Sequence, residues 1–202
     1  MGSLNPVFIT KAAIAERSAE LAKGLVDSAL LGSGQFCTKP GLIFVPNGAS
    51  GFLDEIADYL ATLKVGPLLS ASIAKRYSKA ITEIAASGAV KVLTGQENDS
   101  GFGVTPTLFI TDWATAQKNH ELLEEHFGPT SVIITAEESD YLSIAEKLQG
   151  QLTATIQGAA SDNVAALLSI RSERAGRVIW NGFPTGVEVS KAMMSRTLDL
   201  LR

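Results

Sequence analysis

The sequence is poor in the residues that build disulfides and metal sites, with one cysteine, Cys37, and two histidines among 202 residues. A lone thiol cannot form an intrachain disulfide, and His120 and His126 have no HExxH spacing or second cysteine to complete a zinc site. Apolar runs stay well short of the ~18 residues of a membrane-spanning helix, and no secretion signal begins the chain. These absences predict a cytoplasmic protein with no metal and no membrane partner.

Charge is scarce as well. Charged residues make up 19% of the chain, and the formal net charge is −4. Such a weakly acidic chain offers no general basic surface, so nucleic acid is not an expected partner. The hydrophobic fraction of 46% is sufficient for a compact core, and the length suits one domain covering residues 1–202.

Short apolar runs alternate with helical periodicity along most of the chain. Strands are predicted at residues 7–9, 42–45, 131–135, 152–156 and 177–181, and helices after Thr10 and at residues 52–60, 73–86, 141–148 and 164–170. The polar, glycine-containing interval from Gly88 to Pro106 predicts a surface loop with a short strand. This alternation indicates an α/β fold, a mostly parallel sheet with helices on both faces.

Two glycine clusters fail as phosphate-binding loops. The Gly-Ser-Gly of residues 32–34 follows a helix rather than a strand. The Gly-Phe-Gly of residues 101–103 has Pro106 where the third glycine of a dinucleotide fingerprint would stand. Neither therefore aims free N–H groups at an anion, and both are interpreted as loops.

Cys37 precedes a buried strand on a tight turn, where a nucleophile can face a cleft. Free cysteines are more often small buried apolar residues, and the residues by themselves leave both interpretations open. A catalytic pair of Cys37 with His120 or His126 is also compatible with the sequence, since such partners are distant along the chain. The glutamates between residues 121 and 125 are by themselves typical of the solvated face of a helix.

Several short motifs, taken in order, resemble the aldehyde dehydrogenase superfamily over nearly the whole chain. The main two are Gly-Gln-Phe-Cys at residues 34–37 and Glu-His-Phe-Gly-Pro at residues 125–129. Others are Asn-Pro at 5–6, Pro-Thr-Leu at 106–108, Gly-Gln-Leu-Thr-Ala at 150–154 and Gly-Arg-Val-Ile-Trp-Asn-Gly at 176–182. Residues 35–41 and 183–189 look most like the branch that oxidises α-ketoglutarate semialdehyde (2,5-dioxopentanoate), which also includes fatty aldehyde dehydrogenases.

The resemblance implies the fold of that family's catalytic domain, a small aldehyde substrate, and NADP or NAD as cofactor. As a thiolate, Cys37 would attack the aldehyde carbon, with its backbone N–H supporting the oxyanion; hydride would then leave and water would hydrolyse the thioester. Glu125 would accept hydrogen bonds from the nicotinamide ribose, and Phe127 would pack beside the nicotinamide. The residues expected to line the substrate entrance are Phe36, Phe183, Pro184 and Thr185.

The family comparison also predicts parts that this sequence does not contain. Relatives carry a Rossmann-like cofactor domain and a general-base glutamate before the segment that residues 1–6 resemble, and an oligomerisation segment after the similarity ends near residue 194. We therefore expect a catalytic domain that binds no cofactor stably and is inactive by itself. We also expect self-association, a homo-oligomer, or pairing with a separate cofactor domain.

Two other functions remain compatible with the sequence. One is a cofactor-free cysteine esterase or acyl-transfer enzyme that uses Cys37 alone or with a histidine. The other is a non-enzymatic remnant whose partner would be a separately encoded cofactor domain.

Overall fold

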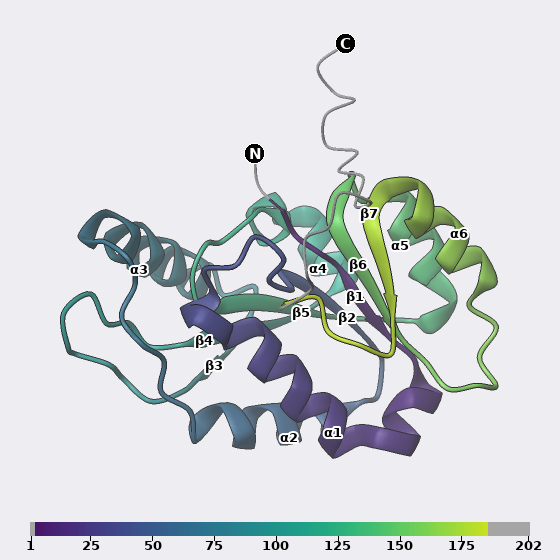
Figure 1. Cartoon of the computed structure of the whole chain (residues 1–202), viewed down its shortest axis with the longest axis horizontal. Helices are drawn as coiled ribbons and strands as arrows, with labels where there is room; N and C mark the ends of the chain where they lie inside the picture. Colours follow the sequence, from purple (N-terminus) through teal and green to yellow (C-terminus); the bar gives the residue numbers. More distant parts are fainter. Residues whose placement is uncertain (1–2, 186–202) are drawn as a thin grey trace, which may run out of the picture.

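The computed structural model describes residues 3–185, which form a seven-stranded sheet in the order β3-β4-β5-β2-β1-β6-β7 (Figure 1). Its neighbouring strands are parallel except for the antiparallel pair of β3 and β4 at one edge. The predicted α/β class with a mostly parallel sheet is confirmed. The strands are β1 Val7–Ile9, β2 Leu42–Pro46, β3 Lys91–Thr94, β4 Thr107–Asp112, β5 Thr130–Ala136, β6 Gln151–Gln157 and β7 Ala175–Trp180.

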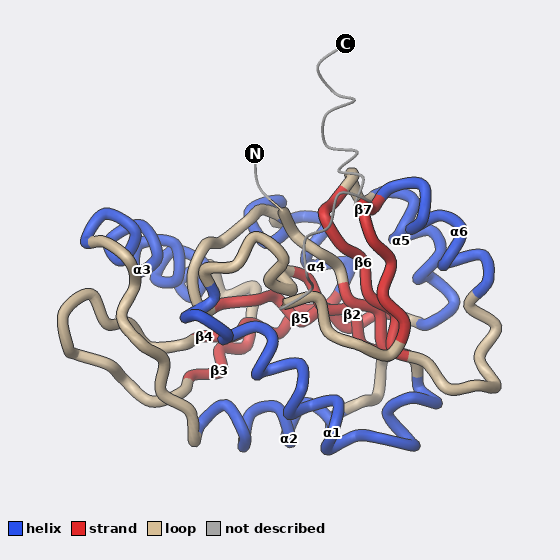
Figure 2. Tube along the Cα trace, viewed as in Figure 1, coloured by secondary structure: helices blue, strands red, loops and turns tan. Residues whose placement is uncertain are grey.

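Helices cover both faces of this sheet (Figure 2). They are α1 Lys11–Leu30, α2 Ser50–Ala61, α3 Ala71–Ala86, α4 Trp113–Lys118, α5 Tyr141–Lys147 and α6 Ala165–Arg174. Helices α1 and α2 pack against one core cluster, whereas α4, α5 and α6 pack against the other.

Alternate residues of each central strand supply the two clusters. In β1, Val7 and Ile9 belong to the cluster under α1 and α2, while Phe8 points to the opposite cluster. In β2, Phe44 stacks on Phe8 with ring centroids 4.8 Å apart. Because both faces are buried, successive side chains must be apolar, which explains the uninterrupted apolar runs of these strands.

Helix α1 begins where the sequence predicts, with Thr10 as its N-cap. The Thr10 hydroxyl accepts the backbone N–H of Ala13 at 3.0 Å and donates to the Asp162 carboxylate at 2.6 Å. The helix ends at Leu30 and continues into a 3₁₀ turn, Leu31–Gly34. This turn brings the chain from the helix to the segment that contains Cys37.

Two elements were not predicted, and one prediction is wrong. Strand β4 and helix α4 follow directly on Pro106, where no element was assigned. The acidic stretch is not a helix, because only His120–Leu123 form a 3₁₀ turn and Glu124 is extended, with φ −102° and ψ 164°. A helix cannot run on from this turn into β5, because Gly128 has a φ of 119° and Pro129 disfavours helical geometry in the residue before it.

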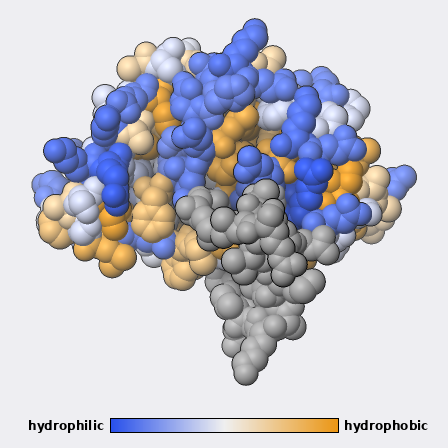
Figure 3. Space-filling model, turned by 90° about the horizontal axis from the view of Figure 1, so that it is seen from above, coloured by the Kyte–Doolittle hydropathy of each residue, from blue (hydrophilic) through white to orange (hydrophobic). Residues whose placement is uncertain are grey.

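The surface keeps several large apolar side chains exposed. Figure 3, which views the molecule from above, shows hydrophobic side chains between hydrophilic ones on this face. The large apolar residues that remain exposed are Leu31, Phe36, Leu69, Val92, Phe102, Phe127, Leu142 and Trp180. Within residues 3–185, no helix combines the length and apolar character needed to cross a membrane.

Candidate active site

The segments that precede strands β1, β2 and β5 meet at the end of the sheet where these strands begin. The strands are adjacent and parallel in the order β5-β2-β1, so their N-terminal ends lie side by side. Cys37 lies before β2, in what we call the cysteine turn (residues 34–41). Glu125 lies before β5, in the glutamate loop (residues 124–129). The sheet order therefore brings together two motifs that are far apart in the sequence.

Gly34 provides a direct contact between the cysteine turn and the glutamate loop. Its φ is +65°, and a Cβ placed on it would lie 2.1 Å from the Gly128 carbonyl oxygen and 2.6 Å from the Pro129 nitrogen. No side chain fits in this space, and the left-handed backbone strains any residue with a Cβ. The glycine of the Gly-Gln-Phe-Cys motif is thus required by contact with the Phe-Gly-Pro part of the other motif.

Lys39 joins the same two segments from inside the protein. Its side chain is 4% exposed, and its ammonium donates to the carbonyl oxygens of His126 at 2.8 Å, Gly128 at 3.2 Å and Thr130. Burial lowers the pKa of Lys39 to about 7, and the charge of Glu125 acts in the opposite direction. The sequence analysis missed this residue, because lysine is usually exposed and nothing in the local pattern shows that this side chain is buried.

Asn5 fixes the other side of the cysteine turn. Its side-chain amide donates to the carbonyl oxygens of Cys37 at 2.8 Å and Lys39 at 2.9 Å, and its Oδ1 accepts the N–H of Thr153 in β6 at 3.1 Å. The residue is 1% exposed and has a φ of 42°. The short Asn-Pro motif therefore anchors the backbone around the cysteine to a neighbouring strand.

Cys37 itself is exposed on this immobilised turn. The interpretation of Cys37 as a buried apolar residue is therefore wrong for this chain. Its backbone N–H makes no hydrogen bond with any residue between 3 and 185. An accessible thiol beside a free N–H donor is an arrangement that can attack a carbonyl carbon and bind the oxygen on which charge develops.

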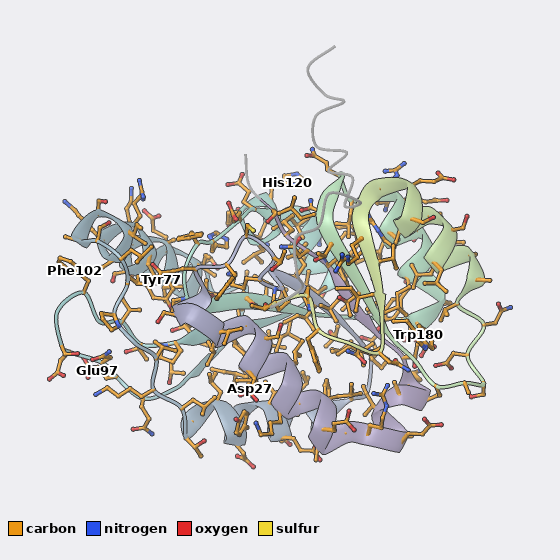
Figure 4. All side chains as sticks on the ribbon, viewed as in Figure 1. Asp27, Tyr77, Glu97, Phe102, His120 and Trp180 are labelled. Carbon is orange, nitrogen blue, oxygen red and sulfur yellow. The ribbon has the colours of Figure 1, made fainter. Side chains whose placement is uncertain are left out.

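Neither histidine is paired with the thiol. The His126 imidazole is hydrogen-bonded to the Glu121 carbonyl oxygen at 2.7 Å, and burial lowers its pKa. His120, labelled in Figure 4, lines a pocket of about 520 Å³ together with Trp113 and Glu125. In the described residues no imidazole contacts the sulfur, and no cluster of three or more His, Cys, Asp or Glu could hold a metal.

Glu125 and Phe127 lie on the rim of a pocket of about 300 Å³ between the glutamate loop and α3. Both side chains are exposed, and Arg76 and Tyr77 of α3 also line the pocket. The hydroxyl of Tyr77, a residue of α3 labelled in Figure 4, lies within hydrogen-bond distance of the carbonyl oxygens of Thr105 at 2.8 Å and Pro129 at 3.2 Å, and so supports the loop from behind. The α3 residues are site candidates that the sequence analysis missed, because a helical pattern does not show what the helix faces.

The pocket fits the nicotinamide riboside end of a dinucleotide in its chemistry. The Glu125 carboxylate can accept hydrogen bonds from two hydroxyl groups, and the 39% exposed Phe127 ring offers an apolar surface for a flat heterocycle. Arg76 adds a permanent positive charge to the lining. These residues can therefore hold the reactive end of NAD or NADP.

The four residues predicted to line the substrate entrance lie beside the end of α1. A Cβ on Gly24 would lie 2.2 Å from the Phe183 ring, and the Thr185 hydroxyl donates to the Ser28 carbonyl oxygen at 2.7 Å. Gly24 and Ser28 are one turn apart on the same face of the helix. Pro184, which lies between Phe183 and Thr185 in the sequence, is buried.

Phe36 continues this line beyond the helix. A Cβ on Gly32, four residues after Ser28, would lie 2.5 Å from the Phe36 ring, which is itself 43% exposed. Phe36 is thus held beside Cys37 with one side open. Residues 186–189, part of the segment that resembled the α-ketoglutarate semialdehyde branch, lie outside the described residues.

Comparison with known proteins supports the family suggested by the motifs. The aldehyde dehydrogenase family profile matches residues 1–193. The chain is 38% identical over 201 residues to the alpha-ketoglutaric semialdehyde dehydrogenase of Acinetobacter baylyi and 36% identical over 200 residues to alpha-ketoglutaric semialdehyde dehydrogenase 2 of Azospirillum brasilense. Each match covers 96% of this chain, and the chain spans 38% of the length of these curated relatives.

Solved structures show the same fold. The NAD-bound Delta-pyrroline-5-carboxylate dehydrogenase of Mycobacterium tuberculosis superimposes with a TM-score of 0.76 at 22% identity, covering 94% of this chain and 36% of that one. An NAD-dependent aldehyde dehydrogenase of Sinorhizobium meliloti gives a TM-score of 0.73 at 22% identity, covering 92% and 38% of the two chains. With the family profile matched almost throughout, the chain belongs to the aldehyde dehydrogenase family.

Proposed function

We propose that this chain supplies the nucleophile and the nicotinamide-contacting loop of an NAD(P)-dependent enzyme that oxidises a semialdehyde to a carboxylate. The observation that carries the proposal is the contact of the cysteine turn with the glutamate loop. It places an exposed Cys37 at the same end of the strands as Glu125 and Phe127. The names of the relatives favour α-ketoglutaric semialdehyde as the substrate.

In this mechanism the Cys37 thiolate attacks the aldehyde carbon, a C–S bond forms, and the carbonyl oxygen gains the negative charge. The free backbone N–H of Cys37 donates to that oxygen. Glu125 would accept hydrogen bonds from ribose hydroxyls and Phe127 would pack against the nicotinamide ring, so that these two residues would position the hydride acceptor. The chemistry that NAD(P) would supply when bound is the acceptance of the hydride from the carbon on Cys37, which leaves a thioester there. Water then hydrolyses the thioester on Cys37, which releases the acid and regenerates the thiol.

The substrate would approach along the end of α1. Phe36 and Phe183 supply apolar walls, with Pro184 and Thr185 between α1 and the entrance. The contacts of this loop with Gly24 and Ser28 fix its distance from the cysteine turn, because α1 runs directly into that turn.

The described residues provide a surface for the nicotinamide end of the cofactor, and we expect the 202 residues alone to reduce no NADP. A second copy of the chain, or a separate polypeptide that carries the cofactor domain, is the proposed partner. An esterase that pairs Cys37 with a histidine is not favoured, since neither imidazole is hydrogen-bonded to Cys37 within residues 3–185.

A chimera tests the function directly. The homologous segment of the Acinetobacter baylyi relative is replaced by residues 1–193 of this chain, and reduction of NAD or NADP with α-ketoglutaric semialdehyde is measured. We expect an active chimera that loses at least about 1,000-fold in kcat/KM on Cys37→Ser, because no other group in the turn can form the thiohemiacetal. Undiminished turnover by the Cys37→Ser chimera would show that the nucleophile lies elsewhere.

A second pair of variants tests whether Glu125 acts on the cofactor rather than on the reactivity of Cys37. We expect Glu125→Gln to raise the KM for the cofactor or lower kcat, while the rate at which iodoacetamide alkylates Cys37 stays unchanged. Glu97→Gln, at an exposed position outside the site, is the matched control and should leave both measurements unchanged. Equal kinetic effects of the two substitutions would remove Glu125 from the cofactor site.

A further inference from the structure

We propose that Lys39 is a positioning residue that makes the cysteine turn and the glutamate loop open and close as one unit, so that Cys37 keeps a fixed position relative to Glu125. This inference rests on the proposed function for its purpose, because hydride transfer requires the carbon on Cys37 and the nicotinamide to be aligned. The coupled opening of the two segments can be tested without substrate or cofactor.

The coupling follows from where the two ends of Lys39 lie. Its backbone belongs to the cysteine turn, with its N–H bonded to the Phe36 carbonyl oxygen at 3.1 Å and its carbonyl oxygen held by Asn5. Its side chain ends in the glutamate loop and at the start of β5, where it contacts the carbonyls of His126, Gly128 and Thr130. Lys39 is therefore part of the backbone of the cysteine turn and is hydrogen-bonded through its side chain to the glutamate loop and the start of β5.

The number of partners matches the chemistry of an ammonium group. A protonated lysine has three N–H donors and no acceptor, and the structure provides three carbonyl acceptors. Opening either segment alone would leave these buried carbonyls without donors and, below about pH 7, where Lys39 is charged in the closed form, would leave the buried charge without acceptors. The two segments are therefore expected to share one opening equilibrium.

Among residues 3–185, the titratable groups that line the small cavity next to the Lys39 ammonium come from the glutamate loop. Glu124, Glu125 and His126 line the small cavity next to it, while β5 contributes only Thr130, Ser131 and Val132 to that lining. The negative charge of Glu125 raises the pKa of Lys39, but burial outweighs it and lowers the pKa from 10.5 to about 7. Burial lowers the pKa of His126, and the positive charge of Lys39 acts in the same direction.

The sign of the pH dependence follows from these values. In an opened form Lys39 is solvated and its pKa returns toward 10.5, whereas in the closed form it is about 7. The open form therefore binds the proton more tightly. Between these two pH values, raising the pH favours the closed form, and below about pH 7 Lys39 is protonated in both forms and opening no longer depends on it.

Amide hydrogen exchange of the 202-residue chain tests the proposal. Protection, corrected for the intrinsic exchange rate, is measured from about pH 6 to about pH 9 in two segments, residues 34–42 and 124–132. We expect the corrected protection of both segments to be constant below about pH 7. Above that pH it should increase in parallel in the two segments, by up to about tenfold per pH unit. In Lys39→Met this gain should disappear from both segments, and their protection factors should separate.

Lys91→Met is the control, because Lys91 is exposed on the edge strand β3 and should leave the pH profile unchanged. A role in stability alone would change protection throughout the sheet and would not remove a pH dependence confined to these segments. Retention of the pH dependence in Lys39→Met would overturn the proposal. So would a wild-type chain whose two segments gain protection at different pH values, a result that does not require the variant to fold. An inactive chimera would count against the proposed function without altering either exchange result.

Discussion

At the scale of single residues, the site depends on groups that hold the loops as much as on the groups that react. Cys37 is exposed, but the backbone around it is fixed by Asn5, Gly34 and Lys39. The motif Gly-Gln-Phe-Cys allowed the nucleophile to be predicted from the sequence. Lys39 could not be predicted, because a lysine becomes a structural tie only when three carbonyls of a distant segment surround it.

Gly34 allows a quantitative test of the contact between the two motifs. Gly34→Ala adds a Cβ 2.1 Å from the Gly128 carbonyl oxygen at a φ of +65°. Gly48→Ala is a matched control, since Gly48 has a φ of +83° but nothing within 4 Å of its added Cβ. The control should lose about 1 kcal/mol of unfolding free energy from backbone strain, and Gly34→Ala about 2 kcal/mol more from the collision. Urea denaturation measures both.

Equal losses in the two alanine variants would mean that the glutamate loop moves aside without cost. In that case Gly34 would not fix the position of the loop, and the match between the two motifs would have another cause.

At the scale of elements, the apolar strands and the longer helices follow from patterns that local chemistry controls. Strands β1 and β2 and the middle of β5 are apolar on both faces, whereas β6 carries glutamine and threonine side chains along one face, and α1 has a side-chain N-cap in Thr10. The acidic stretch before β5 shows the limit of such patterns. Its composition suits a helix, but Gly128, with a φ of +119°, packs against the Tyr77 ring and the chain is extended into β5.

The start of α1 can be tested by two cap substitutions. The Thr10 hydroxyl is 2% exposed and bonds to both Ala13 and Asp162, so Thr10→Ala should lower the unfolding free energy by about 1–2 kcal/mol. The Ser70 hydroxyl, which caps α3, is only partly buried and accepts the N–H of Ile73 at 3.3 Å. Ser70→Ala should therefore lower the unfolding free energy by no more than about 1 kcal/mol. Chemical denaturation of the two variants side by side gives the comparison. A loss at Ser70 that equals or exceeds the loss at Thr10 would contradict it.

At the scale of the whole molecule, exposed apolar residues lie around the cysteine turn. Leu31, Phe36 and Leu69 are 49%, 43% and 77% exposed, and the Leu69 N–H is bonded to the Gln35 side chain in the turn at 2.9 Å. We call these three residues the apolar rim. Uncovered apolar surface of this kind drives association, and we expect copies of the chain to associate through it.

Light scattering tests this association. The wild-type chain should show a mass above the 21.3 kDa of one copy, and the double variant Leu31→Ser/Leu69→Ser should move toward the single-copy mass. Leu142→Ser, which alters an exposed apolar residue of α5, should leave the mass unchanged. A wild-type chain that stays at the mass of one copy at all concentrations would contradict the expectation.

The sequence by itself determined the α/β class, most of the strands, the start of α1 and the identity of Cys37, Glu125 and Phe127 as candidates. These features depend on alternation, capping and short motifs, all of which are local. Only the tertiary structure decided that the cysteine turn and the glutamate loop touch, that Lys39 and Asn5 hold them, and that α3 faces Glu125. Those relations depend on the strand order β5-β2-β1-β6, which brings together segments whose separation along the chain carries no information about their distance in space.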